Sequence, residues 1–485
     1  MLDVTNRLTD TPPVISAESA AQRISADSVV VVSGFGSVGY PKEVPLALAD
    51  SGRDLSLTIV SGGSVGEEID ERLADVDAIA RRYPYQSRRP TRTRINGGDM
   101  AFADAHVSGF GDRIRAGEFG APDVALIEAV AVGPDWLIPT TSIGHTPACV
   151  AAADKLIVEV NEDQPLELQE FHDVYLPSLP PNREAIPLEN PLDRIGTPFV
   201  EFDPEKLSGI VLTERSDTTY EFRDSSPSDE AIADLLVGFL EEEIDRNPFF
   251  EDRLCLQFGV GSLGNALMGG FGDIEIGDRE LVYYGEVIQD GLLDMMDAGK
   301  LSGASAASLA LSEDGLSRLF EEPDRYADNI VVRNGDISNN PALIDRFGVI
   351  GVNSALEVDI YGNVNSTHIG GTHIQNGIGG SGDFNRNAAV SVVALSSIAG
   401  GGSISRIVPM APHVDHTEHD VDVVITEQGL ADLRGLAPDE RAEALVENCA
   451  HPSFREELRS YIARGTNGGG HIQHDLESAY WHLDW

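Results

Sequence analysis

The chain has 485 residues, and 41% of them are apolar, so its length favours two domains with ordinary hydrophobic cores. Its net charge is −46, from 80 acidic and 34 basic side chains. This balance argues against a nucleic-acid partner, because phosphate binding needs a basic face. It also argues against a disordered acidic chain, because the acids are interspersed among periodic apolar segments.

The basic side chains are almost all arginine. Lysine occurs at only four positions, so 30 of the 34 basic residues are arginine. The charges of so acidic a fold repel one another at low salt. At ~1 M salt the Debye length is only about 3 Å, so this repulsion is screened. We therefore predict a halophilic protein.

Three cysteines are widely spaced and form no C-x-x-C, at positions 149, 255 and 449. This pattern predicts a reducing compartment and no disulfide framework. The N-terminal residues lack a basic region followed by an apolar one, and no apolar run approaches 18 residues. We expect a cytoplasmic protein without a membrane segment.

In chain order, the first predicted strand covers 28–32 (SVVVV) and runs into GFGSVG at 34–39, which a helical stretch at 44–49 follows. The next strand, LSLTIVSGG, leads into GGSVG at 62–66. That pentapeptide fits G-x-S-x-G, the turn that carries a serine nucleophile in some hydrolases. Because the chain has 49 glycines, so short a pattern is weak evidence for a serine hydrolase.

The middle of the chain is rich in proline. Seven prolines between 177 and 204 exclude regular helix over most of that stretch and predict an extended crossing segment. A strand is expected at 207–214, and a helix at 230–244, whose apolar residues share one face. We therefore expect a first domain at 1–214, a linker at 215–229 and a second domain at 230–485.

The second domain repeats the opening of the first. An apolar run at 254–258 leads into GVGSLG at 259–264 and a helical stretch at 265–268, which places the second glycine motif 225 positions after the first. Strands that alternate with helices indicate parallel sheets with helices outside. We predict an α/β protein of two similar domains with mostly parallel sheets flanked by helices.

The second glycine motif fits G-x-G-x-x-G, which also occurs in dinucleotide-binding folds. Such folds place an acid roughly 20 residues on, and Glu286 lies 27 positions after Gly259. Glu286 is expected where a strand ends and a helix begins, since apolar residues at 288, 292, 295 and 296 share one helical face. From position alone it could contact a ribose, cap the helix or act as a nucleophile.

Two later stretches are also candidates. HVDHTEHD contains His413, His416 and His419, which could bind zinc, but Pro412 argues against a helix there and favours a solvated polar loop. NGIGGSGDFNRN at 376–387 is dense in glycine, and its backbone N–H groups could stabilise an oxyanion.

Long segments carry a resemblance to one family. They include YPYQSRRPTRTRINGGDMAFADAHVS (83–108), GEVIQDGLLDMMDAGK (285–300), NGIGGSGDFNRNA (376–388) and SRIVPMAPHVDHTEHDVDVVITEQGLADLRGL (405–436). Over almost its whole length the chain resembles the acetyl-CoA hydrolase/transferase family. The resemblance implies two α/β domains of CoA-transferase type, in agreement with the internal repeat.

The same resemblance assigns roles by position. Glu286 matches the glutamate that becomes a glutamyl-CoA thioester, Asn339 the amide that orients it, and Gly380 the backbone oxyanion donor. Ser64 matches a loop that borders the acyl pocket. Gly400 stands where relatives tend to carry a lysine, which leaves open how the CoA phosphates are held. The positions that resemble CoA contacts are Gly259, Val260, Gly261, Ser262, Leu263, Asn376 and Gly380.

The implied activity is transfer of CoA between an acyl-CoA and a small carboxylate, with acetate, succinate or propionate as partners. CoA is then a substrate, no prosthetic group or metal is needed, and a homodimer is expected. Hydrolysis of acetyl-CoA is the main alternative. A nicotinamide-dependent oxidoreductase and a non-catalytic CoA-binding module are more distant ones.

Overall fold

The structure is a computed structural model that describes residues 6–217, 225–259, 261–272 and 274–483. Its contacts divide the chain into two compact units. Unit 1 comprises Met1–Glu221, Tyr283–Met296 and Ser302–Leu343, and unit 2 comprises Phe222–Val282, Asp297–Leu301 and Ile344–Trp485. The expected boundaries at 214 and 230 stay a prediction, and residues 218–224 of the expected linker lie outside the described residues.

The main sheet of unit 1 has the strand order β10-β7-β5-β1-β2-β3-β4, and all these neighbours are parallel. Runs such as VVVV and VALIEAVAV are buried almost throughout, as expected for parallel strands covered on both faces. The strands are β1 (Val29–Val32), β2 (Leu57–Val60), β3 (Ile79–Tyr83), β4 (Ala101–Phe102), β5 (Val124–Val132), β7 (Lys155–Asn161) and β10 (Leu207–Thr213). Antiparallel β6 (Trp136–Pro139) and β9 (Val200–Glu201) branch from β5.

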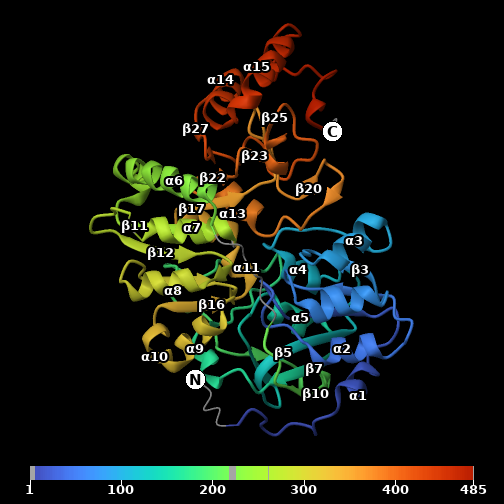
Figure 1. Cartoon of the computed structure of the whole chain (residues 1–485). Helices are drawn as coiled ribbons and strands as arrows, with labels where there is room; N and C mark the ends of the chain where they lie inside the picture. The colour runs from blue at the N-terminus through green and yellow to red at the C-terminus, as the bar shows by residue number, and fades with distance from the viewer. Residues whose placement is uncertain (1–5, 218–224, 260, 273, 484–485) are drawn as a thin grey trace. The chain divides into compact units, whose positions relative to one another are not determined.

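Helices cover this sheet (Figure 1). One group packs together through α1 (Ala17–Ala21), α2 (Glu43–Asp50), the π-helical turn η1 (Glu68–Leu73) and α3 (Arg89–Gly97), and another through α4 (Phe110–Arg115) and α5 (Thr146–Ala152). Apolar residues of α1, α2, η1 and the central strands form one large buried core.

Unit 1 also contains a later segment of the chain. There β14 (Gly303–Ala306), β16 (Ile330–Arg333) and β8 (His172–Asp173) pair in parallel, and β13 (Val287–Ile288) pairs with β15 (Ser308–Leu309). The short strand β12 (Glu280–Tyr284) crosses the division between the units. The helices of this region are α8 (Asp290–Asp297), α9 (Glu313–Glu321), α10 (Pro323–Tyr326), α11 (Gly335–Ser338) and α12 (Pro341–Arg346).

Unit 2 has the strand order β27-β26-β22-β17-β11, in which only β27 is antiparallel. These strands are β11 (Arg253–Phe258), β17 (Val349–Ser354), β22 (Val390–Ala394), β26 (Val423–Thr426) and β27 (Gly429–Asp432). Helices α6 (Pro227–Arg246) and α7 (Ser262–Phe271) lie side by side, and α13 (Ser381–Asn387) packs on β17 and β22 (Figure 1).

The C-terminal part of unit 2 has its own core. Helices α14 (Pro438–Ala444) and α15 (Pro452–Thr466), red in Figure 1, share buried apolar residues with a small sheet. That sheet joins β19 (Val364–Asn365), β18 (Glu357–Asp359) and β25 (Ile407–Val408). Two hairpins complete the unit, β20 (His368–Ile369) with β21 (His373–Ile374), and β23 (Ile398–Ala399) with β24 (Ile404–Ser405).

The internal repeat predicted from the glycine motifs is present in the topology. From β1 outward the order is β5, β7, β10, and from β11 outward it is β17, β22, β26. Each series runs in chain order away from the strand that carries its glycine motif. The prediction of two similar α/β domains with mostly parallel sheets is therefore confirmed.

Several local predictions also hold. The strand expected at 207–214 is β10, and the helix expected at 230–244 is α6, which begins earlier, at Pro227. It begins there because the Ser226 hydroxyl accepts the N–H of Asp229 while the Asp229 carboxylate accepts the N–H of Ser226, a capping box.

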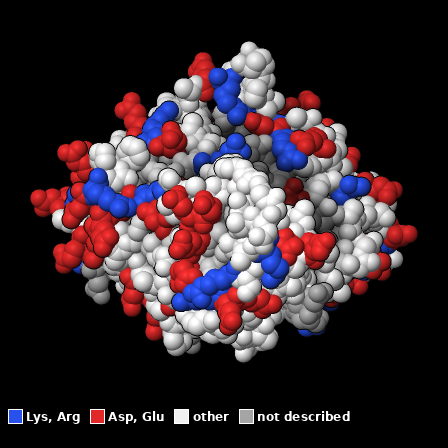
Figure 2. Space-filling model, turned by 90° about the horizontal axis from the view of Figure 1, so that it is seen from above, with Lys and Arg blue, Asp and Glu red and all other residues white. Residues whose placement is uncertain are grey.

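The surface carries the acidic excess of the sequence. On the face drawn in Figure 2, Asp and Glu lie over much of the surface and Lys and Arg form smaller groups beside them. Within the described parts of the chain, no helix has the length and apolar character needed to cross a membrane.

Candidate active site

Glu286 lies in unit 1, in a tight segment between β12 and β13. Its backbone carbonyl accepts the N–H groups of Ala307 and Ser308, at 2.9 and 3.2 Å. The expectation that Glu286 stands at the start of a helix is wrong, because β13 follows it directly and α8 begins only at Asp290. A strand pairing rather than a helix dipole therefore holds this residue.

Asn339 is the polar partner of this glutamate. It is fully buried at the C-cap of α11, and its side-chain Nδ2 donates to Glu286 Oε1 at 3.1 Å. Hydrogen bonds to an ionised carboxylate are stronger than neutral ones and more directional than a bare charge contact. The pair predicted from the sequence is thus formed between residues 53 positions apart.

Ser64 lies in a loop beside the first glycine motif, where its carbonyl accepts the N–H of Ser37 at 3.1 Å. The motif also approaches the glutamate segment, since a Cβ added at Gly36 would lie 3.2 Å from a methyl group of Val287. Unit 1 therefore brings the loop of Ser64 and the segment of Glu286 to the same glycine motif. Ser64 itself is only 6% exposed, whereas a nucleophile elbow exposes its serine.

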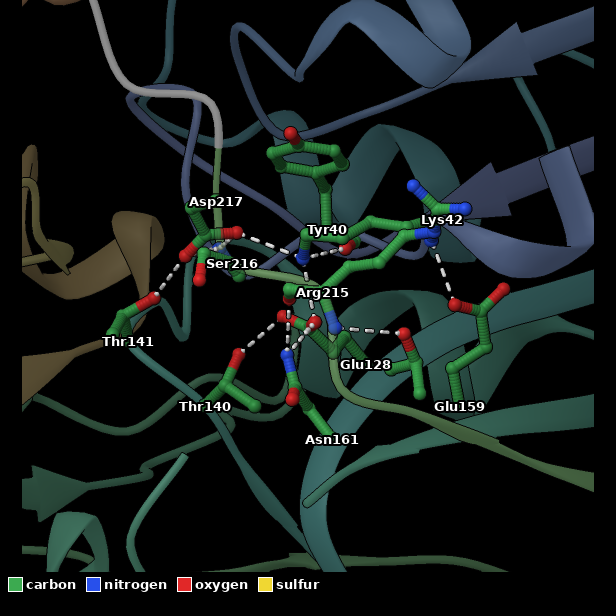
Figure 3. Close-up of polar contacts among 12 residues, drawn as sticks. Tyr40, Lys42, Glu128, Thr140, Thr141, Glu159, Asn161, Arg215, Ser216 and Asp217 are labelled. Carbon is green, nitrogen blue, oxygen red and sulfur yellow. Dashed lines mark hydrogen bonds and ion pairs between the residues drawn. The ribbon is translucent and has the colours of Figure 1, made fainter. Parts of the chain in front are cut away.

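Carboxylates of this chain already bind the Gly39 N–H of the first glycine motif and the N-terminus of the helix that follows the motif (Figure 3). Glu159 accepts the N–H groups of Lys42, Glu43 and Val44, at 2.7, 3.0 and 2.7 Å, at the N-terminus of α2. Asp217 accepts the N–H of Gly39 at 3.1 Å. A phosphate bound to such a motif would use these same donors. The first motif is therefore a structural turn rather than a phosphate site.

A buried lysine, Lys42, forms ion pairs with Asp217 and with a third carboxylate, that of Glu128 (Figure 3). Lys42 Nζ lies 2.6 Å from Glu128 Oε1 and 2.9 Å from Asp217 Oδ1. Burial opposes the charge of Lys42, but attraction from Asp217 and Glu128 outweighs it and raises the lysine pKa. Burial also opposes the charge of Glu159 and raises the pKa of its carboxyl, although hydrogen bonds from three backbone N–H groups lower that pKa.

The sequence reasoning missed Glu128 and Glu159. The signal that could have found them is a single acid inside an otherwise apolar strand, in VALIEAVAV and KLIVEVN. A charge in such a strand is rarely buried unless it is paired. Here each acid meets the donors around Lys42.

The second glycine motif is built differently. Gly261 caps α7 with a φ of 132°, a conformation that favours glycine, and no side chain of the described residues caps this helix. Gly259 donates its N–H to Val352 O at 3.3 Å, while Ser262 and Leu263 form the first turn of α7. Val260, the fifth predicted CoA contact of this loop, lies outside the described residues.

The glycine turn of unit 2 ends at α13. Gly380 is the N-cap of this helix and is buried, and no hydrogen bond from its N–H to another described residue is present. Asn376, at the start of the turn, is partly exposed. Gly400 lies elsewhere in unit 2, exposed in the turn of the β23–β24 hairpin with a φ of 59°.

Two contacts support this turn. Ser381 Oγ donates to Ile378 O at 2.7 Å and lies 3.1 Å from His416 Nε2. His416 is only 2% exposed, so the expectation of a solvated loop is wrong at this residue, although the His413 and His419 side chains are 35% and 80% exposed. Within the described ranges, no three His, Cys, Asp or Glu side chains gather as a metal site would require.

A buried amide network lies behind the loop and the turn. Asn353 on β17 exchanges hydrogen bonds with Gln257 on β11, at 3.2 and 3.3 Å, and donates to Asn385 of α13 at 2.8 Å. Because Gln257 lies two residues before the second glycine motif, this network ties that motif to the helix that follows the glycine turn. Unit 2 thus holds the predicted CoA contacts, and unit 1 holds Glu286, Asn339 and Ser64.

Comparison with known proteins was informative over nearly the whole chain. Residues 3–212 match the acetyl-CoA hydrolase/transferase N-terminal domain, and residues 315–462 match the corresponding C-terminal domain. The chain is 44% identical to a succinyl-CoA:acetate CoA-transferase of Clostridium kluyveri, over 97% of this chain and 88% of that one. It is 39% identical to an acetyl-CoA hydrolase of Yarrowia lipolytica, over 89% and 85% of the two chains.

Solved structures agree on the fold. RipA from Yersinia pestis superposes with a TM-score of 0.71 at 21% identity, over 93% of this chain and 97% of that one. At that level of identity the likeness supports the architecture alone.

Proposed function

Since the chain belongs to the acetyl-CoA hydrolase/transferase family and is an enzyme of that family, we propose that it transfers CoA between an acyl-CoA and a short-chain carboxylate through a glutamyl-CoA thioester on Glu286. The observation that carries the proposal is the Glu286 carboxylate held by Asn339 at 3.1 Å, on a backbone fixed by Ala307 and Ser308. Acetate is one expected carboxylate, with succinate or propionate as the other.

The proposed chemistry has two half-reactions. A Glu286 carboxylate oxygen attacks the acyl carbonyl carbon, the carbon–sulfur bond breaks, and CoA leaves as thiolate, giving an acyl–glutamyl anhydride. The thiolate then attacks the glutamyl carbonyl, the carbon–oxygen bond to the acyl group breaks, and the free acid leaves. A second carboxylate reverses both steps, so the thioester energy is conserved by covalent catalysis.

The other residues have proposed roles in these steps. Asn339 donates to Glu286 Oε1 and orients the carboxylate for attack. Gly380 offers a backbone N–H for the oxyanion of each tetrahedral intermediate. The loop formed by Gly259 and 261–263, with Asn376, contacts CoA, and the N-terminus of α7, which no described side chain caps, suits an anionic group. Ser64 borders the acyl group. No prosthetic group takes part in these steps.

Covalent capture tests the proposal. Incubation with acyl-CoA alone should add CoA to the peptide that contains Glu286, as measured by mass spectrometry, and borohydride should reduce that thioester to an alcohol. Glu286→Ala should abolish both the adduct and turnover. Glu280→Ala is the matched control. Glu280 lies six positions before Glu286 and forms an ordinary ion pair with Arg253 at 2.8 Å. Near-native activity of Glu286→Ala would refute the mechanism.

Net hydrolysis is the second candidate, and the relative named acetyl-CoA hydrolase favours it. Transfer requires that water be kept from the glutamyl thioester. We expect ping-pong kinetics, with acyl-CoA consumed much faster when acetate or another carboxylate is supplied. Release of free CoA at the same rate with and without a carboxylate would instead make the protein a hydrolase.

A further inference from the structure

Two adjacent tyrosines end the strand that leads to the glutamate. Tyr283 and Tyr284 are the last residues of β12, and they are 1% and 0% exposed. Successive side chains of a strand point to opposite faces, so the two hydroxyl groups reach different parts of unit 1. Neither residue has a role in the chemistry described above.

The Tyr283 hydroxyl lies against the backbone of the catalytic segment itself. Hydrogen bonding from the backbone N–H groups of Val287 and Glu286 lowers the pKa of the phenol. The chain makes room for it at Gly285, where an added Cβ would lie 2.4 Å from the Tyr283 oxygen. Burial, followed by the nearby charge of Glu286, raises the pKa of Tyr283, so the phenol is neutral at ordinary pH.

The Tyr284 hydroxyl binds the helix that carries the amide partner. It donates to the carbonyl of Ile337 at 2.6 Å, two residues before Asn339. The Asn339 N–H in turn donates to Gly335 O at 2.9 Å, which closes the same short helix. Tyr284 therefore links the strand before Glu286 to the end of α11.

We propose that Tyr283 and Tyr284 are positioning residues that together set the geometry of the Glu286–Asn339 pair. Tyr283 fixes the backbone of Glu286. Tyr284 fixes the end of α11, from which the Asn339 side chain donates to the Glu286 carboxylate. The inference rests on the proposed function, in which the glutamyl carbonyl is approached in turn by a thiolate and a carboxylate. A fixed backbone confines motion to the side chain, and misplacement by about 1 Å can cost roughly 100-fold in rate.

The test is removal of each hydroxyl by Tyr283→Phe and Tyr284→Phe. We expect each variant to lower kcat about 10- to 100-fold, with KM for acyl-CoA changed by less than about 3-fold. Rates are divided by the fraction of molecules that form the glutamyl-CoA adduct, so misfolded protein does not count. Tyr361→Phe is the matched control, because it removes another buried hydroxyl, which donates to Gln473 O in unit 2. It should leave kcat per competent site unchanged.

A double-mutant cycle separates the two tyrosines. If Tyr284 acts through Asn339, Tyr284→Phe should lower kcat little further in an Asn339→Ala background, whereas Tyr283→Phe should lower it by its full factor. Native kcat per adduct-forming site in both Tyr→Phe variants would overturn the proposal while leaving the thioester mechanism intact. Absence of the adduct from the unmodified enzyme would refute the mechanism itself, and the positioning roles with it.

Discussion

Replacement of Asn339 by alanine removes the hydrogen bond that its amide donates to Glu286, the proposed nucleophile. The amide Nδ2 lies 3.1 Å from Glu286 Oε1, and the backbone of Asn339 keeps its bond to Gly335 O in the variant. A hydrogen bond to a charged group is worth about 1.5–3 kcal/mol, and roughly 1.4 kcal/mol corresponds to a factor of ten in rate. If the contact acts mainly in the transition states, Asn339→Ala should lower kcat about 10- to 150-fold.

The assay is steady-state CoA transfer at saturating carboxylate, together with quantification of the glutamyl-CoA adduct. Asn340→Ala is the control, because that neighbouring side chain accepts the Ala342 N–H at 3.1 Å and lies outside the proposed chemistry. Asn339→Asp should be slower than Asn339→Ala, because a second carboxylate would lie against Glu286 and repel its charge. Equal kcat for Asn339→Ala and the unmodified enzyme would refute the orienting role of this amide.

Three further predictions concern stability. Lys42→Met should lower the free energy of unfolding by about 3–5 kcal/mol in denaturant titrations, because it leaves the buried carboxylates of Glu128 and Asp217 without their cation; adding Glu128→Gln should restore part of the loss, and no restoration would argue against uncompensated charge as the cause. Burial lowers the pKa of His172 to about 4, so between its ordinary value of 6.5 and that value only the unfolded chain binds the proton. The contribution of His172 to the free energy of unfolding should be complete above pH 6.5 and fall by about 3 kcal/mol as the pH drops to 4. His172→Asn should flatten this dependence of stability on pH. An unchanged slope in the variant would contradict the prediction. With a net charge of −46, the protein should lose structure at low ionic strength and regain it in ~1 M KCl, as followed by circular dichroism, whereas full stability in dilute buffer would refute the halophilic prediction.

Much of the local structure and the position of the proposed nucleophile could be read from the sequence. Strands β1 and β11 were predictable because parallel strands buried on both faces are nearly continuous apolar runs, a local property. Helix α6 was predictable because its apolar residues share one face and its cap is built from neighbouring residues. The repeated glycine motif gave the two similar domains, and Glu286 followed from the motif around it.

The contacts that give those residues their roles depend on tertiary structure. Glu286 and Asn339 are 53 positions apart, and their pairing requires β13 and α11 to be brought together in unit 1. The two glycine motifs look alike in sequence. In the first, however, Gly39 donates its N–H to Asp217 and the following helix N-terminus donates to Glu159, and both carboxylates lie more than 110 positions away. His416 became a buried support of the glycine turn in the same way. Periodicity and caps report the neighbours of a residue along the chain, whereas parallel sheets gather residues from distant crossovers, so only the tertiary structure decided which donors stay open for a ligand.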